Sequence, residues 1–171
     1  MNLVLIGYRG TGKSTIGKIL AAELDLEYVC LDDEIAALAG MTIPEIVKAF
    51  SWEHFRDLEE QVVKVCTGRD GQVLDTGGGV ITRLSNIPQL KESGIVFLLT
   101  ATVEDIVRRI GSNQGRPSLK GTKSFTDEVV EVLTEREPLY REAAHFTMNT
   151  SQASPRQIAR QVAEQFRKSC Q

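Results

Sequence analysis

Short apolar runs alternate along the chain with longer amphipathic segments. The short runs predict strands at residues 3–6, 27–30, 72–74, 95–99 and 145–148. The amphipathic or capped segments predict helices at residues 14–24, 43–50, 52–67 and 126–142, and two more that begin near 102 and 154. Residues 111–124 contain three glycines, one proline and many small polar residues, which predicts a mobile loop.

Apolar strands separated by helices are typical of a parallel sheet that is covered on both faces. We therefore expect an α/β fold with three layers, α/β/α. The 171 residues suffice for one domain with a sizeable core. Ligands of such sheets bind at the carboxyl ends of the strands, so the loops after the strands are where a site is expected.

Composition and charge exclude several classes of protein. A net charge of −3 gives no reason to expect binding to nucleic acid or to an anionic membrane. No apolar stretch is long enough to span a bilayer, and the N-terminus does not resemble a signal peptide, so we expect a cytoplasmic protein. Cys30, Cys66 and Cys170 have no metal-binding spacing and are expected to be reduced thiols. The chain has only two histidines, which argues against a histidine metal site or a Ser/His triad.

Residues 7–14, GYRGTGKS, fit the phosphate-loop pattern G-x-x-x-x-G-K-[ST] between a strand and a helix. Glycines let backbone N–H groups point at a polyphosphate, and the helix N-terminus favours negative charge. Lys13 would reach the β- and γ-phosphates, and Ser14 would bind Mg²⁺. The predicted ATP-binding residues of this segment are Gly10, Thr11, Gly12, Lys13, Ser14 and Thr15. The residues alone assign no role to Arg9.

Three carboxylates, Asp32, Asp33 and Glu34, follow the second predicted strand directly. Acids at this place can simply cap the next helix. They should also face the same edge of the sheet as the phosphate loop, where carboxylates serve a metal-bound water or an acceptor hydroxyl. The chain has no Asn-Lys-x-Asp base-reading motif, which argues against a GTPase, and its short length favours a small-molecule kinase.

The chain resembles the shikimate kinase family over about residues 3–166. The resemblance is carried by six segments in order: the phosphate loop, DDE at 32–34, FRDLE at 55–59, GGG at 77–79, RP at 116–117 and EREPLYRE at 135–142. It implies a nucleoside monophosphate kinase-like fold with a five-stranded parallel sheet. It also implies one kinase domain over 1–171, with a substrate-binding helical region at about 32–60 and a lid at about 111–124.

The resemblance further implies an activity. The family phosphorylates the 3-hydroxyl of shikimate with ATP and Mg²⁺, giving shikimate 3-phosphate and ADP in aromatic amino-acid biosynthesis. Shikimate and ATP are thus the expected partners of a monomeric enzyme. Two rivals stay open on the residues alone: a related small-molecule kinase, for example for gluconate, and a non-catalytic ATP-binding regulatory module.

The family's functional residues map onto this chain one by one. Arg56 and Arg136 match the partners of the shikimate carboxylate, and Gly77, Gly78 and Gly79 match the glycines that contact the substrate. Lys13 and Ser14 match the phosphate and Mg²⁺ residues, and Asp32 matches an acid held near Mg²⁺ through water. Arg116 matches the lid arginine that closes on the phosphates, and Arg109 and Pro155 match positions that flank adenine.

One departure concerns the acids. The family usually has Asp-x-Asp here, and its second Asp holds the ring hydroxyls and is the proposed base. The resemblance places Glu34 in that role in this chain, so Glu34, Lys13 and Arg116 are the expected catalytic residues. Glutamate is one methylene longer, so the backbone has adjusted, the acceptor differs, or Asp33 shares the role.

Other residues have two readings. Asp75 either takes a part near Mg²⁺ like that of a Walker-B acid or bonds to backbone. Arg56 has glutamates one helical turn away and can form surface ion pairs with them. Pro138 suggests an interruption of its helix that could aim Arg136 inward. Trp52 and Phe55 are expected in the core.

Overall fold

The computed structural model describes residues 1–111 and 124–170. Five strands form one sheet in which every neighbouring pair is parallel. The five-stranded parallel α/β fold expected from the sequence is thereby confirmed. The strands are β1 (Asn2–Ile6), β2 (Glu27–Cys30), β3 (Gln72–Asp75), β4 (Gly94–Thr100) and β5 (Phe146–Asn149).

The strand order is β2-β3-β1-β4-β5, so β1 lies in the middle of the sheet. Asp75 of β3 pairs with Cys30 of β2 on one side and with Leu5 of β1 on the other. The carboxyl ends of these three strands therefore meet at one edge, where the loops that follow them are brought together.

Several helices begin where the sequence places capping residues. Thr42 and Glu45 form a complete capping box, as do Ser154 and Gln157, and Pro155 occupies the first turn of the last helix. None of the helices within the described ranges is long and apolar enough to cross a membrane. The helices are α1 (Lys13–Leu24), α2 (Leu31–Ala39), α3 (Ile43–Ala49), α4 (Trp52–Thr67), the 3-10 turn η1 (Val80–Thr82), α5 (Asn86–Ser93), α6 (Val103–Gly111), α7 (Phe125–Ala143) and α8 (Pro155–Ser169).

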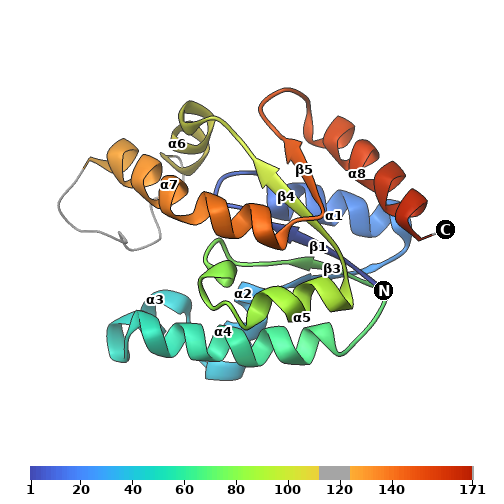
Figure 1. Cartoon of the computed structure of the whole chain (residues 1–171). Coiled ribbons are helices and arrows are strands. Elements are labelled where there is room, and N and C mark those ends of the chain that lie inside the picture. The colour runs from blue at the N-terminus through green and yellow to red at the C-terminus, as the bar shows by residue number, and fades with distance from the viewer. Residues whose placement is uncertain (112–123, 171) are drawn as a thin grey trace.

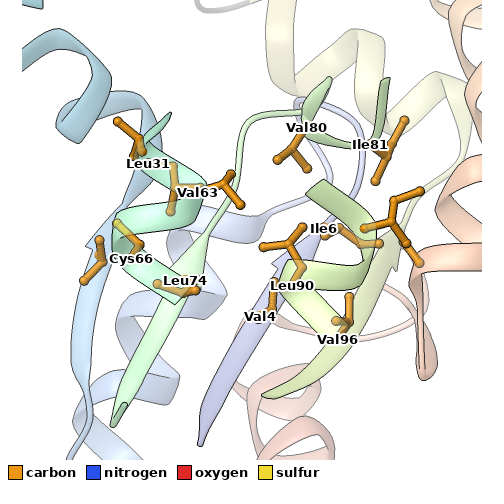
Figure 2. Packing of buried hydrophobic residues seen from close by; sticks show 14 of the residues in the cluster. Val4, Ile6, Leu31, Val63, Cys66, Leu74, Val80, Ile81, Leu90 and Val96 are labelled. Carbon is orange, nitrogen blue, oxygen red and sulfur yellow. The ribbon is translucent and has the colours of Figure 1, made fainter. Parts of the chain in front are cut away.

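Two apolar cores lie on opposite faces of the sheet. Helices α1 and α8 cover one face, while α2, α4, α5 and the end of α7 cover the other (Figure 1). On the second face, Val4, Leu74 and Val96 of the strands pack with Val63 of α4 and Leu90 of α5 (Figure 2). This burial supplies the main favourable free energy of folding and fixes the helices against the sheet.

The structure corrects the sequence analysis in two places. Helix α5 and the turn η1 were not predicted, because the segment Asn86–Ser93 is short and contains Pro88. The predicted interruption at Pro138 is wrong, since α7 continues through it. Pro138 is exposed, so the carbonyl that loses its helical partner can be hydrated.

The unexpected helix α5 offers a test of the core. Leu90 is fully buried there, whereas Leu84, just before the helix, is 62% exposed. We expect Leu90→Ala to lower the free energy of unfolding by about 2–5 kcal/mol, because it leaves a cavity. The matched change Leu84→Ala should cost less than about 0.5 kcal/mol. Urea denaturation of the three proteins measures both, and equal losses would show that α5 does not pack as described.

Candidate active site

The phosphate loop joins the end of β1 to the start of α1, as the sequence predicted. The ammonium group of Lys13 is buried and donates to the carbonyls of Gly7 at 2.8 Å and Tyr8 at 3.1 Å. Gly12 caps the helix with a φ of 98°, a left-handed conformation that suits glycine. The first N–H groups of α1 thus open toward the loop, which makes an anion site.

Arg109 of α6 braces this loop. Its guanidinium donates to the carbonyl of Gly10 at 3.1 Å and to the hydroxyl and carbonyl of Thr150 at 3.1 and 3.2 Å. The hydroxyl of Thr150 in turn donates to the carbonyl of Thr11 at 2.8 Å. Pro155 is exposed at the start of α8. The adenine contacts of Arg109 and Pro155 stay predictions.

Asp75 lies beside the phosphate loop at the end of β3. It is 3% exposed, and its Oδ2 accepts hydrogen bonds from Ser14 Oγ at 2.6 Å and from the Tyr28 hydroxyl at 2.7 Å. Of the two readings of Asp75, this contact with Ser14 favours the part near a metal. A hydroxyl and a carboxylate are oxygen ligands of the kind that Mg²⁺ prefers, so the residues fit the ion. Tyr28 was missed, because the strand register that brings it to Asp75 is not visible in the sequence.

A pocket lies next to this edge, on the other side of the glycine segment Gly77–Gly79. It combines three arginines, two carboxylates and an apolar wall. Its lining residues are Tyr8, Arg9, Asp32, Ile43, Trp52, Phe55, Arg56, Glu59, Gly77, Gly78, Gly79 and Arg136.

Arg56 and Glu59 form a buried ion pair in this pocket. The distance from Arg56 Nη1 to Glu59 Oε2 is 2.6 Å, and Glu59 is fully buried. Burial raises the pKa of Glu59, and the neighbouring Arg56 partly offsets that rise. The second oxygen, Oε1, has no hydrogen-bond partner within the described part of the chain. Arg56 thus forms an ion pair and also lines the pocket. The central carbon of its guanidinium lies 5.0 Å from the centroid of the Phe55 ring.

Arg136 and Tyr140 hold the glycine segment from the side of α7. Arg136 Nη1 donates to the carbonyl of Gly78 at 3.0 Å, and the Tyr140 hydroxyl donates to the same oxygen. Burial raises the pKa of Tyr140 to about 12, so its hydroxyl remains a donor at neutral pH. Arg136 faces inward because it shares one face of an unbroken helix with Tyr140, four residues on.

Space at the glycine segment is tight. A Cβ atom at Gly79 would lie 2.0 Å from Arg56 Nη2. A Cβ atom at Gly77 would lie 2.8 Å from Glu59 Oε1 and 3.0 Å from Asp32 Oδ1. The two carboxylates therefore converge on Gly77, and the absence of side chains is what lets Arg56, Glu59 and Asp32 reach the pocket.

The structure separates the three acids of α2. Asp32 lines the pocket, whereas Asp33 and Glu34 are exposed and do not line it. The helix turns by about 100° per residue, so Glu34 points about 200° away from Asp32 around the axis. This placement speaks against the expected role of Glu34 as the carboxylate that faces the acceptor.

Two predictions lie where the structure gives no description. Arg116 and residues 112–123 of the predicted lid are outside the described residues. The role of Arg116 on the phosphates stays a prediction.

Comparison with known proteins agrees with this geometry. The family model for shikimate kinase matches residues 9–167. The chain is 37% identical over 165 residues to the shikimate kinase of Thermodesulfovibrio yellowstonii, covering 96% of this chain and 94% of that protein. It is 40% identical over 171 residues to shikimate kinase 2 of Enterobacter sp. strain 638, covering 98% and 97%. The solved structure of the Acinetobacter baumannii shikimate kinase in complex with shikimate matches with a TM-score of 0.92 and 36% identity, covering 98% and 93%. The chain therefore belongs to the shikimate kinase family.

Proposed function

We propose that this protein transfers the γ-phosphoryl group of ATP to the 3-hydroxyl of shikimate, giving shikimate 3-phosphate and ADP. The observation that carries the proposal is a pocket with Arg56, Arg136 and Asp32 beside a phosphate loop. Family membership supports the reaction class, and the matching Acinetobacter baumannii structure is a complex with shikimate.

Arg56 and Arg136 bind the carboxylate of shikimate in this proposal. A guanidinium holds a planar carboxylate through two parallel hydrogen bonds, and the partial burial of Arg56 strengthens the attraction. Glu59 holds Arg56 in place, because its carboxylate is buried and bonded to the guanidinium. The ring of the substrate is thereby oriented before the reaction, which contributes most to such a transfer.

Asp32, rather than Glu34, faces the hydroxyl groups of the ring and can accept the proton of the 3-hydroxyl. Its carboxylate lies within the pocket next to Gly77. If Asp32 is the second acid of the family's Asp-x-Asp pattern, the first position in this chain is Cys30. The departure from the family then lies at Cys30, at the end of β2, and not at the acid that faces the acceptor.

The ATP side uses the phosphate loop. When nucleotide is bound, Lys13 contacts the β- and γ-phosphates in place of the carbonyls of Gly7 and Tyr8. Arg116 is expected to add positive charge beside the phosphates. Ser14 and Asp75 would hold Mg²⁺, which supplies compensation for the negative charge of the phosphates. We place the enzyme in the cytoplasm, where ATP is available, and expect it to act as a monomer, because one chain provides every group of the pocket.

The reaction is tested by coupled ADP release with Mg²⁺ and ATP, with shikimate and gluconate assayed in parallel. We expect strong stimulation by shikimate and none by gluconate. The two arginines hold a substrate carboxylate that is attached to a rigid ring, and gluconate has no ring. Stimulation by gluconate alone would favour the related small-molecule kinase. ATP binding without transfer to either acid would favour the regulatory module.

The assignment of Asp32 as the acid that faces the acceptor is tested by replacing Asp32 and Glu34, which lie on the same turn of α2, with the corresponding uncharged amides. We expect Asp32→Asn to lower kcat/KM for shikimate by at least about a hundredfold, because it removes the carboxylate that faces the hydroxyl. Glu34→Gln should leave kcat/KM essentially unchanged, because residue 34 is exposed outside the pocket. A loss confined to Glu34→Gln would restore the assignment made from the sequence.

The glycine segment is tested by Gly79→Ala. The backbone there has a φ of −107°, which alanine adopts, but the new Cβ would displace the Arg56 guanidinium. We expect KM for shikimate to rise by roughly ten- to a hundredfold. Gly68→Ala is the matched control, since a Cβ there meets its nearest atom at an ordinary 3.4 Å. An unchanged KM for Gly79→Ala would mean that Arg56 does not grip the substrate from this position.

A further inference from the structure

The hydroxyl of Tyr28 donates a hydrogen bond to Asp75 on the nucleotide side of the site, but the function proposed above gives it no role. We infer that Tyr28 is a positioning residue for the metal-bound nucleotide, acting through Asp75. The inference rests on the proposed function, because it assumes that Ser14 and Asp75 serve a cation that accompanies ATP.

Two hydroxyl groups converge on one oxygen of Asp75. Tyr28 donates to Oδ2 at 2.7 Å and Ser14 donates to the same atom at 2.6 Å. No described residue donates a hydrogen bond to the other oxygen, Oδ1. The two bonds fix the rotation of the carboxylate about its last single bond, so Oδ1 is the atom left for a hydrated cation. Partners of this kind, one step removed from a metal, orient its ligands.

The surroundings of Tyr28 hold its hydroxyl in this place. Tyr28 pairs with Val73 in β3, two residues before Asp75, so both side chains project from the same face of the sheet. Its ring lies against α1, where a Cβ at Gly17 would come within 2.9 Å of the ring, and Lys18 Nζ lies 5.6 Å from the ring centroid. A phenolic hydroxyl is protonated at neutral pH, so the Tyr28 hydroxyl is a hydrogen-bond donor to Asp75.

The alternative is that Tyr28 only fills space against α1. Tyr28→Phe separates the two, because it keeps the ring and removes only the hydroxyl. We would titrate the full-length protein with ADP by calorimetry, once with MgCl₂ and once with EDTA. We expect the affinity for ADP with Mg²⁺ to fall by about tenfold or more and the affinity in EDTA to stay unchanged.

A matched control is Tyr140→Phe, which removes another buried hydroxyl on the acceptor side, where it donates to Gly78. It should raise KM for shikimate and leave the affinity for ADP with Mg²⁺ unchanged. A double-mutant cycle of Tyr28→Phe with Ser14→Ala adds a second readout. The two losses should be less than additive, because both hydroxyls act on one carboxylate oxygen.

The outcomes distinguish the inference from the proposal beneath it. If Mg²⁺ strengthens ADP binding equally in the parent and in Tyr28→Phe, the inference is overturned and the metal site stands. Equal losses with Mg²⁺ and with EDTA would show a structural role only and would also overturn it. If Mg²⁺ does not strengthen ADP binding to the parent, the proposed metal role of Ser14 and Asp75 fails, and the inference with it.

Discussion

The parallel register of β2, β3 and β1 places Cys30, Asp75 and Leu5 opposite one another at the carboxyl edge of the sheet. The phosphate loop, the first turn of α2 and the glycine segment all leave from this edge. A slip of one residue in any pair would turn every side chain of that strand to the other face. The two apolar cores prevent such a slip, so packing remote from the site determines which groups can meet there.

The acceptor pocket contains a charged pair, Arg56 and Glu59, that is largely shielded from water. Glu59 is fully buried, and the contact with Arg56 is the largest of the favourable interactions that offset its desolvation. A buried pair of this kind adds little net stability, but removing one partner leaves an uncompensated charge. We interpret the pair as a device for orientation: the carboxylate of Glu59 fixes a guanidinium that would otherwise be long and flexible, so that little side-chain entropy remains to be lost when a substrate binds.

The sequence predicted what depends on local pattern. The five strands and the phosphate loop followed from apolar runs and glycine spacing, and the family resemblance pointed to Arg56 and Arg136, which the structure brings into one pocket. It could not predict which acid faces that pocket, because α2 begins at Leu31, and this start sets the helical phase of Asp32 and Glu34. The contact of Tyr28 with Asp75 could not be predicted for a related reason, since it depends on strand register.

The glycine segment also lies between the phosphate loop and the acceptor pocket. On one side, the Thr76 hydroxyl donates to the carbonyl of Leu5 at 2.9 Å, and a Cβ at Gly78 would lie 3.3 Å from the backbone nitrogen of Arg9. On the other side, Arg136 and Tyr140 both bind the carbonyl of Gly78. Backbone atoms thus connect the phosphate loop to the acceptor pocket. Because errors of about 1 Å in the separation of reacting groups are costly, a spacer made of main chain is better suited to this task than one made of flexible side chains.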